Sequence, residues 1–124
     1  METINLKEKF STFSDLWNQR LLGVINDCAV KIVKVKGEFI WHHHDVEDEL
    51  FLVVKGVLRM KFRDHEALIH EALIREGEFV IVPHGVEHCP IADDEVHLVL
   101  IEPKSTLNTG NIVNERTVAP LESI

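Results

Sequence analysis

Residues 39–50 read FIWHHHDVEDEL, three consecutive histidines followed by four carboxylates within five positions. On an extended strand alternate side chains share a face, so His42 and His44 would lie together while His43 points away. Glu49, after a short acidic turn, is placed to begin the neighbouring strand beside them. A solvated edge strand would explain an isolated His-x-His equally well. A metal site therefore requires a further ligand from elsewhere in the chain.

The sequence around this stretch is typical of short β-strands separated by glycine, proline and acidic turns. The clearest strand is residues 57–63, where Leu58, Met60 and Phe62 alternate with basic side chains, as in a half-buried strand of an antiparallel sheet. We expect strands over residues 28–36, 39–45, 50–55, 57–63, 79–82 and 97–101. Short strands at this spacing predict an all-β sandwich or barrel.

The chain begins with a helical pattern over residues 5–17. Asn5 is a suitable N-cap, and Glu8 follows it at the spacing of a capping box. The apolar side chains that recur at helical spacing after it are Leu6, Phe10, Phe13 and Trp17. No linker divides the chain, so we expect one domain over residues 1–124 with a short N-terminal helix.

Composition narrows the classes of partner. The chain has 124 residues, 45% of them hydrophobic, and a net charge of −8, which argues against nucleic acid because phosphate binding needs clustered Lys and Arg. No apolar run approaches the roughly 18 residues needed to cross a bilayer. The N-terminus lacks the apolar region of a signal peptide, and the two cysteines suit a reducing compartment. We therefore expect a cytoplasmic protein that has no nucleic-acid or membrane partner.

A five-residue tandem repeat, HEALI at residues 65–69 and again at 70–74, lies between two expected strands. Five is an odd number, so an extra copy within a strand would turn every later side chain to the opposite face. We therefore expect the extra copy in the loop of a hairpin. Glu, Ala and Leu favour helix, which suggests a helical turn there.

Further along the chain, residues 77–90 read GEFVIVPHGVEHCP and supply His88 as a fourth candidate ligand. Together with the first stretch they resemble the two motifs of the cupin family, the first at residues 37–56 and the second at 77–92. Two departures are Ala92, where the second motif ends on Asn, and a gap before His42 that is one residue shorter than usual. The resemblance covers about residues 30–102 and is carried by Gly37, His42, His44, Glu49, Gly56, Gly77, Pro83, Gly85 and His88.

This resemblance implies a double-stranded β-helix, the jelly-roll barrel of the cupins, with a metal near its open end. It also implies that the metal ligands are His42, His44, Glu49 and His88. Three imidazole nitrogens and one carboxylate oxygen suit a divalent transition ion such as Fe, Mn, Ni, Co, Cu or Zn. An octahedral ion would keep two positions open for a substrate or water.

A cavity beside this site is expected to be mostly apolar, because Phe51 and Val53 would share the face of Glu49. The expected lining residues are Ile40, Phe51, Val53, Met60 and Phe62. Such a cavity favours a small organic ligand, and no glycine-rich loop is present to hold a polyphosphate or nucleotide cofactor.

Three functions fit these observations, because a cupin-like fold alone does not decide function. The first is a metal-dependent enzyme, an oxygenase-type oxidoreductase acting on a small organic molecule, in which Glu49 is a ligand that also acts as a catalytic base. The second is a non-catalytic module that binds or senses a metabolite. The third is a sugar or sugar-phosphate isomerase, for which the pocket lacks a cluster of Lys and Arg.

Outward apolar side chains predict a homodimer. Trp41, Leu50 and Leu52 would form a surface of the kind that rarely stays open on a soluble monomer. The polar tail that begins at Pro103 is expected to run as a strap across the outside of the barrel.

Overall fold

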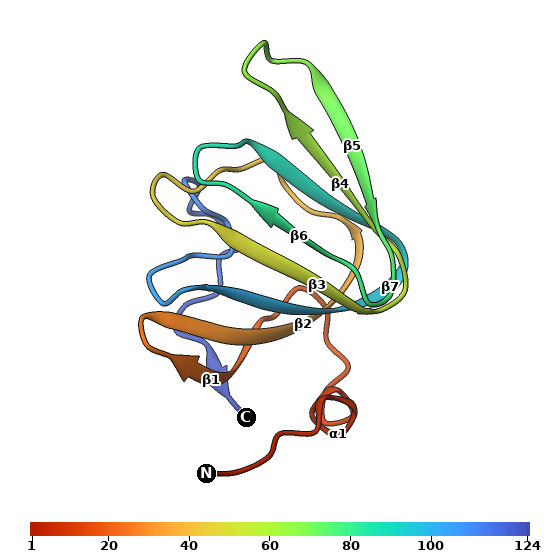
Figure 1. Cartoon of the computed structure of the whole chain (residues 1–124), viewed down its shortest axis with the longest axis vertical. Coiled ribbons are helices and arrows are strands. Elements are labelled where there is room, and N and C mark those ends of the chain that lie inside the picture. Colours follow the sequence, from red (N-terminus) through yellow and green to blue (C-terminus); the bar gives the residue numbers. More distant parts are fainter.

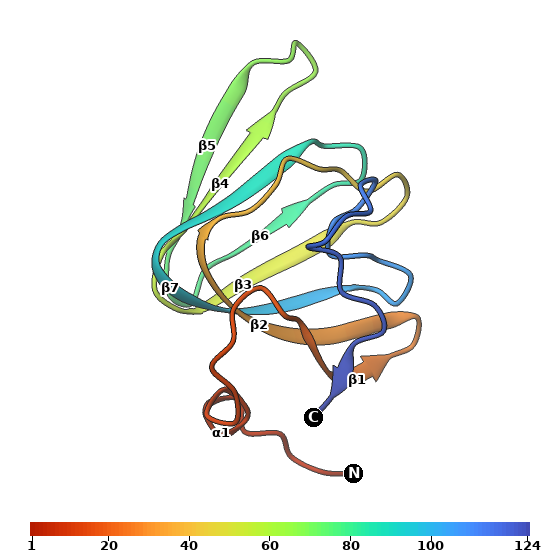
Figure 2. The ribbon, with the colours of Figure 1, turned by 180° about the vertical axis from the view of Figure 1, so that it is seen from behind.

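The computed structural model describes residues 1–124, whose strands form a single curved sheet (Figures 1 and 2). The sheet order is β5-β4-β7-β2-β1-β8, and β3 pairs with both β7 and β6. Apart from the short β1–β8 pairing, which is parallel, neighbouring strands are antiparallel. The strands are β1 Arg20–Ile25, β2 Cys28–Glu38, β3 Glu49–Lys55, β4 Leu58–Arg63, β5 Ile69–Ile74, β6 Phe79–Val82, β7 His88–Pro103 and β8 Glu122–Ser123.

Two long strands fold this sheet back on itself. The first part of β7 pairs with β4, and its later part pairs with β3, while β2 runs beside most of its length. The register of β2 against β7 is irregular between Val35 and Gly37, which bends both strands. The two halves of the folded sheet therefore face each other around one interior. The all-β jelly-roll barrel expected from the sequence is confirmed.

Side-chain alternation fills the interior. In β4, Leu58 and Met60 are almost completely buried while Arg59 and Lys61 lie on the outer face, as expected for a half-buried strand. The same alternation in the other strands completes one apolar cluster. It consists of Val33, Val35, Phe51, Val53, Leu58, Met60, Ile74, Val82, Ala92, Val96, Leu98 and Leu100.

The N-terminal helix is present but shorter than the pattern over residues 5–17 predicted. Helix α1 spans Leu6–Phe10, and the side chain of Asn5 accepts a hydrogen bond from the backbone N–H of Glu8 at 2.9 Å. The helix ends where Phe10 is buried against Ile32 and Val99 on the outer face of the sheet. The chain then leaves the helix and runs alongside β2, where the N–H of Trp17 donates to Lys34 O at 2.8 Å.

Several strand predictions need correction. Residues 39–45 do not form a strand, and only an isolated bridge joins His42 to His88. The expected strand at 97–101 is the later part of β7, and β1, β5 and β8 were not expected. The second HEALI copy forms β5 rather than a helical turn, because its backbone pairs with β4 from Leu58 to Arg63. The first copy supplies most of the hairpin turn.

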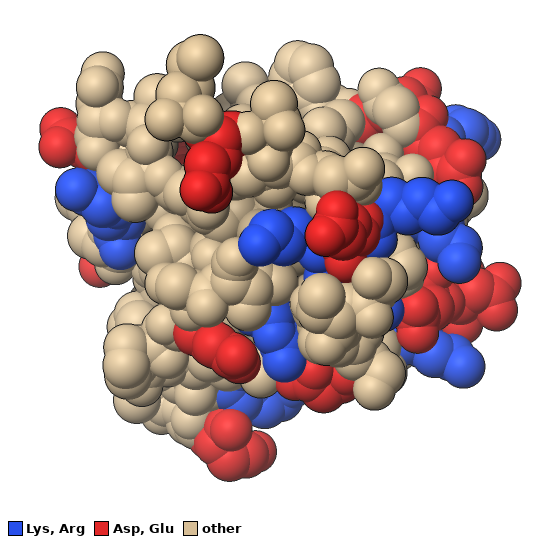
Figure 3. All heavy atoms as spheres, turned by 90° about the horizontal axis from the view of Figure 1, so that it is seen from below, with Lys and Arg blue, Asp and Glu red and all other residues tan.

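The surface carries both signs of charge. On the face seen in Figure 3, basic and acidic side chains lie next to one another, separated by stretches of uncharged residues. No helix is long and apolar enough to cross a membrane.

Candidate metal centre

The fold brings the four predicted ligands to one point inside the barrel. His42 and His44 lie on the segment before β3, Glu49 is the first residue of β3, and His88 is the first residue of β7. All four are buried, and their ligand atoms lie within 4.8 Å of one another. Backbone hydrogen bonds of 3.0 and 2.9 Å between His42 and His88 tie the two motifs together.

Backbone carbonyls orient two of the imidazoles. Nδ1 of His42 lies 2.9 Å from Ile40 O, and Nδ1 of His88 lies 2.9 Å from Val86 O. A carbonyl oxygen only accepts, so each Nδ1 carries the proton and each Nε2 keeps its lone pair for the site. This is the arrangement that fixes the tautomer of metal-binding histidines.

The carboxylate of Glu49 stands among these nitrogens. Its Oε1 lies 2.7 Å from His44 Nε2 and 3.2 Å from His88 Nε2. His44 Nε2 is buried and has no hydrogen bond of normal geometry. Lone pairs of nitrogen and oxygen that converge on one buried point are stabilised by a cation, so the donor set fits a divalent transition metal.

The electrostatics of the apoprotein agree with this fit. Burial, followed by the proximity of His88, lowers the pKa of His42 to about 4, which keeps this imidazole neutral and able to bind a metal. Burial alone would raise the pKa of Glu49. Contact with the Glu102 carboxyl, followed by the nearby His44 and His88 imidazoles, outweighs that effect and holds the pKa of Glu49 well below the usual range, so the carboxylate stays ionised.

A second buried carboxylate lies directly behind Glu49. The pairing of β3 with β7 places Glu102 across from Glu49, one residue beyond the Leu50–Ile101 pair, on the same inner face. Lys31 Nζ donates to Glu102 Oε1 at 2.7 Å and to Thr106 O at 3.2 Å. Burial and the charge of Glu49 raise the pKa of Glu102 well above its usual value. Glu102 is therefore the protonated member of the carboxyl pair.

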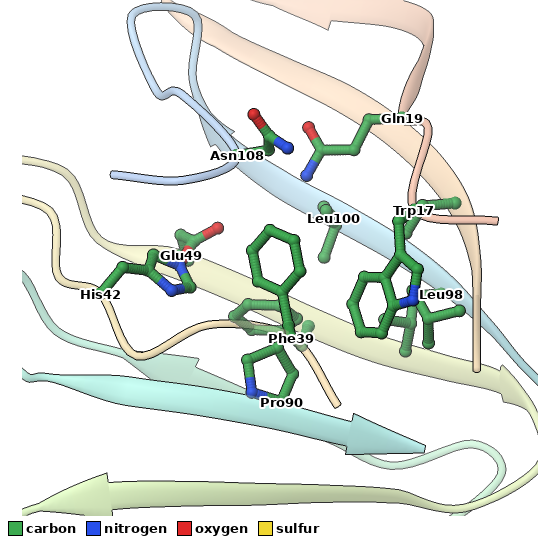
Figure 4. Close-up of a pocket in the computed structure, with 12 residues that line it drawn as sticks. Trp17, Gln19, Phe39, His42, Glu49, Pro90, Leu98, Leu100 and Asn108 are labelled. Atoms are coloured by element: carbon green, nitrogen blue, oxygen red, sulfur yellow. The ribbon is translucent and has the colours of Figure 1, made fainter. Parts of the chain in front are cut away.

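A narrow cavity opens next to the ligands (Figure 4). His42 and Glu49 form part of one side, and the apolar floor comes from strands β2, β3 and β7. Its free volume of about 30 Å³ has room for about two water molecules. The residues that line it are Trp17, Gln19, Val33, Val35, Phe39, His42, Glu49, Phe51, Pro90, Leu98, Leu100 and Asn108.

The predicted lining residues are distributed differently from the expectation. Phe51 lines this cavity, whereas Val53 is fully buried in the core. Met60 and Phe62 line a separate apolar hollow between β4 and β6, although Phe62 pairs with His88 in the register of β4 against β7. Ile40 lines neither hollow, and its carbonyl oxygen instead contacts the ring of His42.

The cavity wall includes residues outside the two motifs. Trp17 and Gln19 come from the segment between α1 and β1, and Asn108 comes from the tail after β7. Trp17 belonged to the helical pattern predicted over residues 5–17, but the helix ends at Phe10. Gln19 and the polar tail carried no periodic signal that could have placed them. The tail is also more buried than an external strap would be, and Asn108 and Thr109 are inside the fold.

Gly110 shows how closely this tail packs against the segment that carries the histidine ligands. Gly110 has a φ of +58°, and a Cβ there would lie 2.2 Å from the carbonyl oxygen of His43. The same oxygen accepts a hydrogen bond from Asn111 N at 2.9 Å. Only glycine permits this approach, so the tail holds the histidine segment in place where strand pairing does not.

Comparison with known proteins agrees with the fold and the two motifs. An uncharacterized protein, YdbB of Bacillus subtilis (strain 168), is 34% identical over 83 residues, which are 67% of this chain and 64% of that protein, less than two thirds of its length. The crystal structure of a cupin-2 domain containing protein from Shewanella frigidimarina NCIMB 400 is 42% identical. It covers 82% of this chain and 94% of its own, with a TM-score of 0.76.

More distant structures share the fold alone. Hydroquinone 1,2-dioxygenase PnpCD, solved in complex with Cd2+ and 4-hydroxybenzonitrile, is 16% identical with a TM-score of 0.64, covering 78% of this chain and 70% of that one. The Cupin domain family matches residues 29–102, a range that contains all four buried ligands and both motifs. The chain belongs to the cupin domain family.

Proposed function

We propose that this cupin binds one divalent transition metal and is an oxygenase-type oxidoreductase acting on a small organic molecule. The observation that carries the proposal is the convergence of three imidazole nitrogens and one carboxylate oxygen beside an apolar cavity. A dioxygenase with the same fold, hydroquinone 1,2-dioxygenase PnpCD, supports the choice of reaction class. A bound Fe, Mn, Ni, Co, Cu or Zn ion would supply Lewis-acid or redox chemistry there.

The chain's own residues have distinct parts in this proposal. Carbonyl oxygens hold His42 and His88 with Nε2 toward the site, so the ligand geometry exists before a metal arrives. Glu49 Oε1 faces the same point and is the group we propose as catalytic base, accepting a proton from a substrate bound beside it. Phe39 and Phe51 line the cavity with apolar surface that excludes water.

An isomerase acting on sugar phosphates is less well supported. No Lys or Arg lines the cavity, and the one charged group on its wall is the Glu49 carboxylate. A phosphate group would therefore find no cationic partner from the protein.

The proposal is tested with the Fe(II)-loaded protein and a matched pair of variants, Glu49→Gln and Glu47→Gln. Glu47 lies outside the four-residue cluster and accepts a hydrogen bond from Ser105 at 2.8 Å, a contact that glutamine preserves. Under anaerobic conditions the parent and Glu47→Gln should give the optical and EPR signals of a nitric oxide adduct, and Glu49→Gln should lose most of its iron. O2 uptake with a panel of small organic substrates then measures turnover.

Two results would overturn parts of the proposal. A protein that retains only Zn(II), gives no nitric oxide signal and consumes no O2 would be a binding module rather than an oxygenase. Equal iron content in Glu49→Gln and Glu47→Gln would show that Glu49 is not a ligand.

A further inference from the structure

The side-chain amides of Asn108 and Gln19 both line the cavity, and only the amide of Asn108 is satisfied (Figure 4). Asn108 donates through Nδ2 to Arg116 O at 2.8 Å and accepts through Oδ1 from Val118 N at 2.9 Å. Both ends of its amide are therefore occupied by the tail. Asn108 has a structural role on this wall.

The side-chain amide of Gln19 is not satisfied in this way. Its side-chain amide lines the cavity, the residue is 8% exposed, and its Oε1 is buried without a hydrogen-bond partner. A buried polar atom without a partner costs folding free energy, and such atoms are rare in native proteins. Methionine has nearly the same shape and would avoid that cost at this position. The fold therefore gains nothing from an amide here unless a ligand uses it.

The surroundings define what Gln19 could recognise. Trp17 and Phe39 stack on each other beside it, with ring centroids 4.8 Å apart, and the floor of the cavity is aliphatic. No Lys or Arg lines the cavity, and the guanidinium of Arg116 lies over the rings of Phe39 and Trp17, 4.6 and 5.3 Å from their centroids. The wall beside Gln19 therefore offers an anionic group no direct counter-charge. An amide both donates and accepts, which suits a neutral hydroxyl group.

We propose that Gln19 is the specificity residue of this site and hydrogen-bonds a neutral hydroxyl on a small, otherwise apolar ligand whose other end faces His42 and Glu49. This inference rests on the proposed metal site and adds the class of its ligand. The narrow cavity limits that ligand to a molecule of few non-hydrogen atoms. A hydrogen bond to the amide contributes most to binding where water is excluded. The site should therefore distinguish ligands mainly by whether they carry this hydroxyl.

The test uses short alkyl hydroxamates, which chelate a metal through two oxygens, and their analogues with one terminal hydroxyl. The pairs are acetohydroxamate with glycolohydroxamate, and propionohydroxamate with 3-hydroxypropionohydroxamate. The two pairs place the terminal hydroxyl at two different distances from the metal. Binding to the Co(II)-loaded parent is measured by calorimetry and by the visible Co(II) spectrum. The parent should favour the hydroxylated member of at least one pair by about tenfold.

The variants Gln19→Met and Gln19→Leu should reduce that preference to less than about twofold, while Co(II) affinity stays at the parent value. Asn18→Ala is the matched control, because Asn18 bonds to Asp15 and lies off the cavity wall. It should keep the parent's preference. Melting temperatures of the metal-free proteins show that the variants fold, and both Gln19 variants should melt at or above the parent.

The outcomes separate this inference from the proposed function. Co(II) binding by the parent with no preference in either pair, or a preference that survives in both Gln19 variants, would overturn the role of Gln19 and leave the metal site standing. Failure of the parent to bind Co(II) would overturn both.

Discussion

The charge state of His42 is coupled to folding. In the unfolded chain an imidazole takes up a proton near pH 6.5, whereas in the apoprotein the pKa of His42 is about 4. Between these values the unfolded state binds more protons, so the free energy of unfolding falls as pH falls. We expect His42 to contribute a loss on the order of 3 kcal/mol across this window.

The measurement compares the metal-free parent with His42→Gln by urea unfolding at intervals from pH 7 to pH 4. The comparison is needed because the raised pKa of Glu102 has the opposite effect, destabilising the protein above pH 4.5. Subtracting the two curves isolates His42. A difference that does not change with pH would contradict the assignment.

Lys31 donates to the protonated Glu102 carboxyl deep inside the fold, where the two side chains are 4% and 0% exposed. Removing one partner of such a pair leaves an uncompensated polar group in the core. We expect Lys31→Met to lower the free energy of unfolding by about 1–3 kcal/mol, because the buried Glu102 carboxyl loses its partner. Arg59→Met breaks two surface pairs, with Glu71 and Asp93, and should cost much less, because exposed pairs contribute little. Equal losses in urea unfolding would show that burial does not determine the cost.

Among single residues, the sequence predicted the four clustered residues and Phe51 of the cavity wall, but not the rest of that wall. His42, His44, Glu49 and His88 could be placed because motif spacing links them. Gln19 and Asn108 could not, since they lie in irregular segments whose positions depend on tertiary hydrogen bonds, such as those from the tail to Asn108.

Among the elements, the β4–β5 hairpin allows a test of the HEALI repeat. The two copies are identical, so removing residues 70–74 gives the same chain as removing 65–69. The remaining copy can keep the pairing from Leu58–Ile74 to Phe62–His70, with Arg63 and Asp64 as a two-residue turn. No buried residue or candidate ligand is lost. We expect metal content to be unchanged and the free energy of unfolding to change by less than about 1 kcal/mol.

The control is deletion of Leu73 alone. This single deletion shifts the pairing of β5 by one position and turns Ala72 or Ile74 away from the interior. It should destabilise the protein far more than removal of a whole repeat. The reverse order of melting temperatures would show that the hairpin turn packs against the core.

Strands were predicted correctly where apolar and polar side chains alternate strongly. They were predicted wrongly where pairing in the folded protein overrode the local helix or strand preference of the sequence. The alternation of β4 gave both its strand and its inner face. The helix-forming residues of HEALI became a strand because β4 presents a free edge to pair with. The reverse occurred in residues 39–45, whose backbone hydrogen bonds are divided among β7, Gly85 and the tail instead of following one strand.

For the whole molecule, we propose a homodimer formed through the outer face of β3 and β6. Leu50 pairs with Ile81 and Leu52 with Phe79 in this register, and Phe79 and Ile81 are 60% and 54% exposed. Apolar side chains clustered in this way are typical of an interface. We expect a dimer mass by light scattering at micromolar concentration and a monomer for Ile81→Lys. Val113→Lys alters an isolated exposed side chain and should remain dimeric. A monomeric parent would rule the dimer out.

The central claim, that four side chains from two distant motifs form one metal site, is tested most directly by the metal content of the purified protein. Elemental analysis after dialysis should find about one divalent transition ion per chain in the parent and in Glu47→Gln. The variant His88→Ala, whose side chain comes from the second motif, should retain less than about a tenth of that amount. A parent without bound transition metal, or a His88→Ala variant with the parent's content, would contradict the account.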